Sequence, residues 1–226
     1  MTTLNELNGT YTLDPSHTEI GFTARHAMVT KVRGAFNEFE GTATTGANLA
    51  DARIDVTIQA ASVDTKSADR DNHLRSGDFF DVETYPTIRF TSTQVTSPDA
   101  QTLRVAGDLT IKDVTKPVVI DFEYDGAALD PFGNQRVGLS GKVDVNRKDF
   151  GLVWNAALET GGVLVSENVT LAFEVSAIKQ ADAEAAAEPV AEAPEPVEAP
   201  AAARAAQPES KGIAGWFKSL FSSSNR

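Results

Sequence analysis

Three histidines are the first side chains of this sequence that could do chemistry: His17, His26 and His73. Histidine is the usual acid–base group and metal ligand near neutral pH. None of the three belongs to a His-x-x-x-His pair, and the chain has no cysteine that could complete a metal-binding motif. We therefore interpret each as a structural histidine and predict no metal site. Convergence of all three on one metal ion is the alternative.

A charged segment, residues 69–90, is the second candidate. It combines two adjacent rings, Phe79 and Phe80, with a dense run of ionisable groups: Arg70, Asp71, His73, Arg75 and Asp78. Carboxylates within reach of guanidinium groups keep low pKa values and make poor general bases at neutral pH. Because unpaired buried charge is very costly, we expect the charges to pair at a rim while the two rings turn inward. The segment is therefore predicted to cap the end of a barrel.

The common catalytic motifs are missing from the sequence. It contains no Gly-x-Ser-x-Gly nucleophile elbow, no phosphate-binding glycine loop and no dinucleotide fingerprint. We predict no catalytic residue and no cofactor. An enzyme that acts on a hydrophobic substrate through the histidines and the Arg70–Asp78 groups is the alternative hypothesis.

The formal net charge of the chain is -12. Such an acidic protein lacks the basic face that releases counterions from nucleic acid, so nucleic acid is not an expected partner. The first residues show none of the features of a signal peptide, and no stretch is apolar for long enough to span a bilayer. The expected location is the cytoplasm, with peripheral attachment to the inner membrane face.

Short segments with a period of two must position these groups. Apolar side chains alternate with polar or small ones, as in Ile20, Phe22 and Ala24. About eight such segments with frequent turn signals predict an all-β fold, an eight-stranded antiparallel barrel with a short helical or loop cap. Closure removes exposed sheet edges, and a β-sandwich is the alternative. Glycines within the segments indicate sharp bends, close approach of another group, or ordinary bulges: Gly34, Gly107, Gly138 and Gly141.

Several separated motifs together resemble the YceI-like family, lipocalin-like barrels that bind polyisoprenoids. The motifs are Leu13-Asp14-Pro15-Ser16-His17, Arg25-His26, Arg33-Gly34-Ala35-Phe36, Arg70-Asp71-Asn72-His73-Leu74, Asp78-Phe79-Phe80, Tyr85-Pro86-Thr87-Ile88-Arg89-Phe90, Gly107-Asp108-Leu109-Thr110-Ile111, Asn146-Arg147-Lys148-Asp149-Phe150-Gly151 and Val165-Ser166-Glu167-Asn168-Val169. The resemblance covers roughly residues 10–178. Tyr11, Thr18 and Asp113 differ from the family's usual Trp, Ser and Gly, which concerns ligand preference rather than the fold.

The resemblance implies that the barrel binds a long-chain isoprenoid-type lipid, polyprenyl or quinone-like, and holds or carries it. A ten-residue strand is about 33 Å long, and each buried methylene is worth about 0.8 kcal/mol. The side chains expected to contact the lipid are Phe22, Met28, Phe36, Phe39, Phe79, Phe80, Phe90, Leu109, Ile111, Phe150 and Trp154. Those expected in the cap network or against a head group are Arg25, His26, Arg70, Asp71, His73, Asp78 and Arg147. The alternative for the first set is a solid, packed core.

The C-terminal part differs in composition. Residues 181–210 are rich in Ala, Pro and Glu and bury too little apolar surface to fold, so they are predicted to form a disordered linker. Residues 211–226 are basic, with apolar side chains on one helical face that suit an anionic membrane surface or a groove of a protein partner. The expected contact residues are Ile213, Trp216, Phe217, Lys218, Leu220 and Phe221.

These boundaries predict a barrel at residues 10–180 after an N-terminal extension at residues 1–9. Two alternatives to a membrane or partner contact remain for the last segment. In the first, the segment has no function. In the second, the barrel core is solid and the protein is an interaction module that binds its partner through this segment.

Overall fold

The structure is a computed structural model that describes residues 3–46, 48–159 and 161–181. Its strands are β1 (Gly9–Leu13), β2 (Glu19–His26), β3 (Thr30–Phe36), β4 (Phe39–Thr45), β5 (Arg53–Gln59), β6 (Val63–Asp64), β7 (Thr87–Thr96), β8 (Thr102–Ile111), β9 (Val114–Leu129), β10 (Gln135–Asn146) and β11 (Asn168–Lys179). Its helices are α1 (Ala68–Arg75) and the short 3-10 helices η1 (Leu4–Glu6), η2 (Leu49–Asp51), η3 (Ala60–Ser62) and η4 (Arg147–Phe150). Apart from Ala181, the predicted linker and terminal segment lie outside the described residues.

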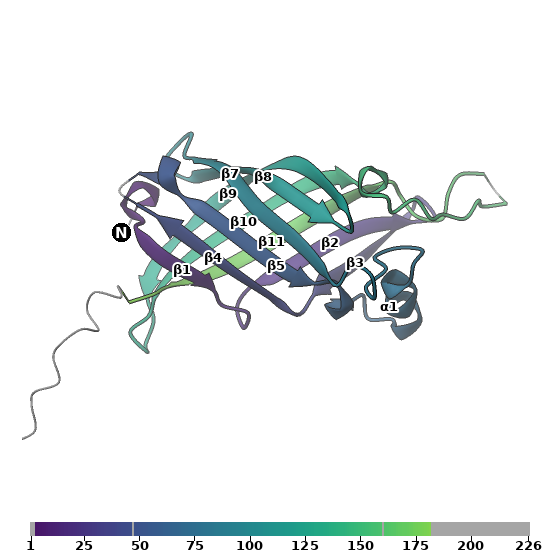
Figure 1. Cartoon of the computed structure of the whole chain (residues 1–226), viewed down its shortest axis with the longest axis horizontal. Coiled ribbons are helices and arrows are strands. Elements are labelled where there is room, and N and C mark those ends of the chain that lie inside the picture. The colour runs from purple at the N-terminus through teal and green to yellow at the C-terminus, as the bar shows by residue number, and fades with distance from the viewer. Residues whose placement is uncertain (1–2, 47, 160, 182–226) are drawn as a thin grey trace, which may run out of the picture. The chain divides into compact units, whose positions relative to one another are not determined.

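Eight of these strands form a closed ring. They pair in the order β1-β4-β5-β7-β8-β9-β10-β11, and β11 pairs back with β1 (Figure 1). Strand β2 also pairs with β11, and β3 pairs with β2, so this hairpin extends the wall beyond β1 and β4. Every one of these ladders is antiparallel. The prediction of a closed eight-stranded antiparallel barrel is confirmed.

The alternation of side chains along each strand gives the barrel an apolar inside. In β8, for example, Leu103, Val105 and Leu109 are buried, whereas Arg104 and Asp108 between them are exposed. Successive side chains of a strand point to opposite faces of the sheet, so one face of β8 is apolar. The same pattern in the neighbouring strands builds one continuous apolar interior.

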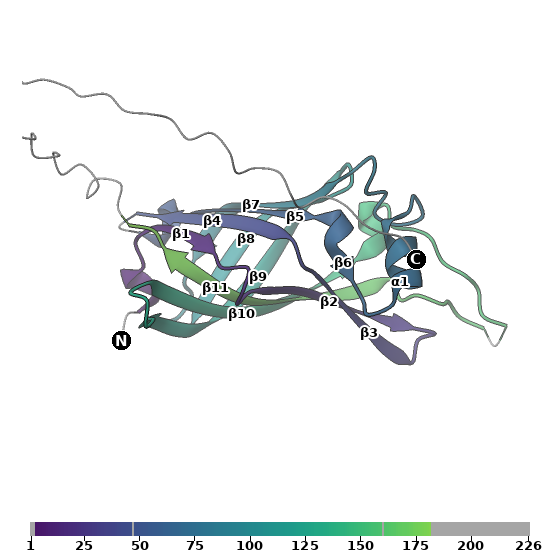
Figure 2. The same ribbon diagram turned by 90° about the horizontal axis from the view of Figure 1, so that it is seen from below.

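The two ends of the barrel are closed by different elements (Figures 1 and 2). Helix α1 lies at one end, here called the α1 end. Asp69 and Asp71 fall in its first turn and His73 and Arg75 in its last turn, which suits the helix dipole, although Arg70 also lies in the first turn. The described N-terminal residues, with η1, lie at the other end, here called the N-terminal end. No helix among the described residues is long and apolar enough to cross a bilayer.

Gly34 and Gly107 approach phenylalanine rings most closely on the inside of the wall. A Cβ atom on Gly34 would lie 2.4 Å from the Phe22 ring, and one on Gly107 would lie 2.4 Å from the Phe90 ring. Only glycine leaves room for a ring this close to the strand. The predicted close approach at these two positions is therefore confirmed, and the approaching group is an aromatic side chain of a neighbouring strand.

Candidate functional site

The interior of the barrel contains a cavity of about 260 Å³. Its lining reaches from Leu74 and Phe79 at the α1 end to Leu13 and Ala177 near the opposite end. Thr18 and Arg147 are the lining residues with polar side chains, and the other lining residues are apolar. The cavity is thus a long apolar space inside the barrel wall, of the kind that shelters a slim hydrophobic molecule.

Most of the side chains predicted to contact a lipid line this cavity. They come from β2, β3, β7, β8, η4 and the segment after α1: Phe22, Phe36, Phe79, Phe80, Phe90, Leu109, Ile111 and Phe150. Several of these rings touch, since the Phe36 ring lies 5.8 Å from Phe22 and 5.6 Å from Phe80. The fold therefore brings aromatic residues that are distant in sequence to one apolar surface.

Three residues of the predicted set lie elsewhere. Met28 is 52% exposed because the backbone turns at Ala27 and Met28, where both φ angles are positive, so the alternation of β2 does not continue to this residue. Phe39 and Trp154 pack against the hydrophobic core but do not line the cavity. The placement of Met28 corrects the expectation of an inward side chain.

Aliphatic lining residues from both halves of the chain, such as Ile20, Val56 and Ile120, were not among the predicted lipid contacts. Phe122 and Phe173, whose rings lie 5.8 Å apart, were missed with them. The signal was present, because Val118, Ile120 and Phe122 alternate along β9 and all line the cavity. The predicted contacts are mainly aromatic residues near the family motifs, so aliphatic residues of several strands are absent from them.

Among the residues that the structure describes, Arg147 is the one charged side chain in the cavity lining. It is 6% exposed and donates hydrogen bonds to the carbonyl oxygens of Ser166 (2.9 Å), Leu152 and Val165 (3.4 Å). It belongs to none of the ion pairs formed by the described residues. Burial lowers the pKa of Arg147.

The charge of the Glu167 carboxylate partly offsets the lowering of the Arg147 pKa, but this carboxylate forms its ion pair with Lys148 (2.5 Å). A buried guanidinium satisfied only by carbonyl groups keeps its full charge without a compensating anion. This leaves a positive charge buried behind the apolar surface of the cavity.

The cap at the α1 end is fastened through backbone groups. Buried Asp71 accepts hydrogen bonds from the Thr65 amide (2.8 Å) and hydroxyl (2.5 Å). Arg70 donates to the Thr65 hydroxyl (2.7 Å) and carbonyl (2.6 Å), and Arg75 donates to the carbonyls of Ala61 and Val63 (both 2.7 Å). The expected pairing of these arginines with aspartates is wrong, because their donors are used mainly by the Thr65 hydroxyl and by backbone carbonyl oxygens around the short strand β6.

His73 and Asp78 do pair, with His73 Nε2 2.9 Å from Asp78 Oδ2. The His73 ring also meets Trp154 and Phe79 edge-on, at centroid distances of 4.6 and 5.1 Å. Phe79 is buried beneath these groups. This part of the cap has the predicted arrangement, with a polar rim over inward-facing rings.

Arg25 and His26 lie outside the cavity lining. Both are exposed at the end of β2, and His26 forms an isolated backbone bridge with Val165. Arg25 lines a separate hollow of about 730 Å³ on the outer surface, together with Met28. The other charged residues of this outer hollow are Lys31, Arg33, Lys142, Asp144 and Glu167. The inward position expected for His26 is wrong because the strand ends here.

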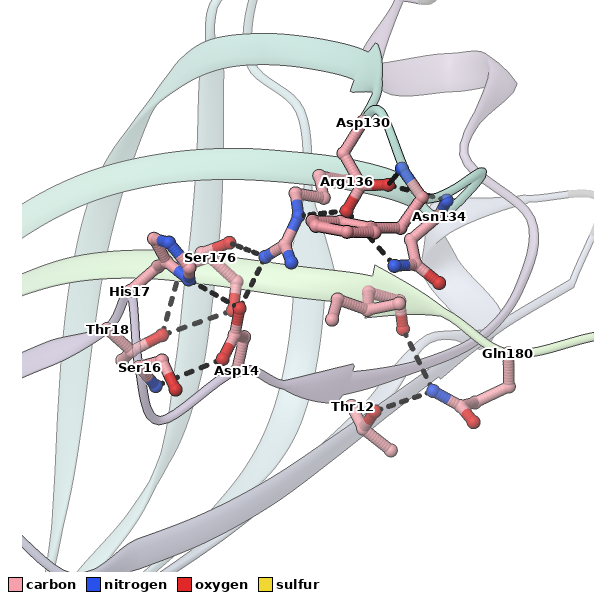
Figure 3. A network of polar contacts seen from close by, with 12 residues as sticks. Thr12, Asp14, Ser16, His17, Thr18, Asp130, Asn134, Arg136, Ser176 and Gln180 are labelled. Carbon is pink, nitrogen blue, oxygen red and sulfur yellow. Dashed lines mark hydrogen bonds and ion pairs between the residues drawn. The ribbon is translucent and has the colours of Figure 1, made fainter.

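Asp14 and His17 belong to a polar network between the β1–β2 turn and the β9–β10 hairpin (Figure 3). Asp14 accepts hydrogen bonds from His17 Nδ1 (2.7 Å) and from Arg136, and Arg136 Nε also donates to Asp130 (2.8 Å). The Arg136 hydrogen bond lowers the pKa of Asp14 to about 2. A carboxylate held in this way is a poor general base, so the network fits a structural role.

The three histidines therefore contact three different sets of groups. Within the part of the chain that the structure describes, no three His, Asp or Glu side chains gather as metal ligands would.

Comparison with known proteins places this geometry in a family. The family model of the YceI-like domain matches residues 11–177. A UPF0312 protein of Staphylococcus aureus strain N315 is 37% identical over 169 residues, which cover 74% of this chain and 95% of the relative. The Campylobacter jejuni YceI protein has a solved structure with a TM-score of 0.60 and 32% identity, covering 75% of this chain and 97% of that one. A polyisoprenoid binding domain from Saccharophagus degradans shares the fold, with a TM-score of 0.57 and 15% identity over 75% of this chain and 98% of that one. The chain belongs to the YceI-like family.

Proposed function

We propose that this protein binds a long-chain isoprenoid-type lipid, polyprenyl or quinone-like, inside the barrel and holds or carries it without bond chemistry. The observation that supports this most directly is the apolar cavity, whose lining runs through most of the barrel. A domain with the same fold, from Saccharophagus degradans, is described as polyisoprenoid-binding. The burial of each methylene contributes about 0.8 kcal/mol, so a chain of modest length is retained without any catalytic step.

We further propose that Arg147 binds the polar end of the lipid. Its charge is buried beside the cavity without an anionic partner among the described residues. A phosphate or carbonyl oxygen of a head group would accept a hydrogen bond from the guanidinium and offset the cost of its burial. The apolar chain would then extend along the barrel toward the N-terminal end.

Solvent extraction of the purified protein, followed by mass spectrometry, tests the binding proposal. We expect one class of prenyl lipid, with at most one lipid molecule recovered per protein molecule. The control is protein carrying Leu109→Trp, which narrows the cavity and should retain less lipid, with circular dichroism used to verify that it is folded. Equal recovery of lipid from both proteins would exclude binding in the cavity, and a chemically altered lipid would favour the enzyme hypothesis.

The role of Arg147 is tested by competition between a prenyl phosphate and a hydrocarbon of equal length. Wild-type protein should prefer the phosphate by about tenfold or more, since hydrogen bonds to charged groups are worth about 1.5–3 kcal/mol. Arg147→Met should lose this preference, even though it also lowers stability. Arg25→Met, at an exposed arginine of the outer hollow, should keep it. An unchanged preference in Arg147→Met would show that the head group binds elsewhere.

We also propose that the protein works in the cytoplasm, at or near the inner membrane face. The basic segment 211–226, with Trp216 and Phe217, supports contact with an anionic lipid surface. Such a contact would let the barrel exchange its ligand with the membrane. Docking of the same segment in a protein groove is the competing proposal.

A further inference from the structure

We propose that residues 3–8 form a stopper at the N-terminal end of the barrel and set the longest lipid chain that the cavity accepts. This inference rests on the proposed function, because it concerns the selectivity of the same cavity. It assigns a role to a segment that sequence patterns indicate only as an extension before the barrel.

The stopper is held by two deeply buried leucines. Leu4 is 1% exposed and Leu7 is 9% exposed, although both precede the first strand. They pack in one hydrophobic cluster with Leu103 and Val105 of β8. Both of these β8 residues line the cavity, whereas Leu4 and Leu7 do not. The two leucines therefore lie just behind the wall that ends the cavity.

Polar contacts fix the segment in this position. The Thr3 amide donates to Glu6 Oε2 (2.7 Å), and the Leu7 amide donates to the Leu4 carbonyl (3.2 Å), so η1 forms one tight turn. Lys179 Nζ at the end of β11 donates to Asn8 Oδ1 (2.8 Å). Glu6 and Asn8 are exposed, whereas the leucines are buried. The stopper thus has a polar side toward solvent and an apolar side toward the barrel interior.

The segment is separate from the part of the chain that defines the family. The family model begins at residue 11, after Leu4 and Leu7. At the opposite end, the cap is built from residues inside the family match, such as Asp71 and Phe79. Closure of the N-terminal end is therefore a property of this chain that the family match does not include. Removing the stopper should lengthen the space available to a ligand and leave the barrel walls in place.

The test uses the full chain and a mixture of all-trans prenyl alcohols of increasing length, from farnesol to solanesol, at equal concentrations. Each protein is incubated with the mixture, separated from unbound alcohol by gel filtration and extracted for mass spectrometry. The variants are the Leu4→Ala and Leu7→Ala double substitution and a deletion of residues 2–8. The deletion is included because it removes the whole stopper. Leu129→Ala is the matched control, since Leu129 is 73% exposed.

We expect wild-type protein and Leu129→Ala to retain the same range of lengths. Both stopper variants should shift the range toward longer alcohols, with the ratio of long to short chains rising about tenfold. If both variants fold and retain the same range of alcohol lengths as wild-type protein, the stopper proposal is wrong and the lipid-binding proposal stands. Failure of every protein to retain any prenyl alcohol overturns the lipid-binding proposal, and the stopper with it.

Discussion

Gly107 shows how a single residue shapes the inner wall. A Cβ atom here would lie 2.4 Å from the Phe90 ring and 2.6 Å from the Thr91 carbonyl oxygen. A ring can turn, but the backbone of the neighbouring strand cannot move without disturbing its ladder. The absence of a side chain at this position therefore lets the Phe90 ring lie close to the strand and line the cavity.

We predict that Gly107→Ala destabilises the protein by about 1–3 kcal/mol, the usual cost of overpacking a well-packed site. The measurement is urea unfolding followed by circular dichroism. Gly77→Ala is the control, since a Cβ atom at Gly77 meets nothing within 4 Å. Equal stability of the two variants would contradict the close approach seen at Gly107.

The carboxylate of Asp14 makes the stability of the protein depend on pH. Its hydrogen bond from Arg136 lowers its pKa from the ordinary 3.8 to about 2, and its side chain is 11% exposed. A carboxylate with a lowered folded-state pKa stabilises the protein above its unfolded pKa. This stabilisation is lost as the pH falls through the folded value, here between about pH 4 and pH 2.

We predict that Asp14→Asn is less stable than wild-type protein by about 2 kcal/mol near neutral pH. The difference should shrink between about pH 4 and pH 2, because the wild-type carboxylate becomes neutral there. Urea unfolding of both proteins across this range is the measurement. Glu83→Gln, at an exposed carboxylate, serves as the control. A difference that stays constant down to the lowest pH would mean that the charge of Asp14 contributes nothing.

At the scale of elements, helix α1 is held to the barrel mainly by its polar groups. Its apolar residues are few, and Asp71 is its buried residue. The carboxylate of Asp71 satisfies both the amide and the hydroxyl of Thr65, which directly follows β6. Since β6 is only two residues long, these contacts do much to keep the cap in place over Phe79.

We predict that Asp71→Ala lowers the free energy of unfolding by about 1–3 kcal/mol, the cost of leaving buried donors unpaired. It should also speed hydrogen exchange of the amides between β6 and α1. Asp69→Ala removes an exposed carboxylate from the same helical turn and is the control. Exchange that is equally slow in both variants would show that other contacts secure the cap.

At the scale of the whole molecule, charge is unevenly distributed. The chain carries a net charge of -12, yet residues 211–226 contain three basic residues and no acidic one. Lys31 and Arg33 of the outer hollow form a second basic surface, on the barrel itself. Electrostatic attraction to an anionic bilayer acts within about one Debye length, roughly 8 Å at physiological salt, so either surface can act despite the overall negative charge.

We predict that deleting residues 211–226 abolishes co-sedimentation with vesicles that contain phosphatidylglycerol, because the deletion removes both the basic and the aromatic groups. Neutral phosphatidylcholine vesicles provide the background. A full-length variant with Lys31→Glu and Arg33→Glu should still bind. The opposite result, in which only this variant loses binding, would assign the contact to the barrel and contradict the proposal for the terminal segment.

The sequence alone determined which side chains form the apolar inner face of the barrel wall. Alternation with a period of two determines which side chains share a face, so the sequence alone predicts that Phe22, Leu109 and Ile111 point inward. The same rule fails where strands end. Continuing the pattern of β2 predicts that His26 and Met28 point inward, but both are exposed because the chain turns at that point.

The tertiary structure decided what the ends of the barrel are made of. Leu4 and Leu7 precede the alternating pattern, and their burial depends on strands nearly a hundred residues away in the chain. Arg147 becomes a lone charge beside the cavity only because the carbonyls of Ser166, Leu152 and Val165 converge on it. Periodicity is a local property that a sequence carries by itself, whereas closure of the ends depends on contacts between distant segments, which only the folded chain brings together.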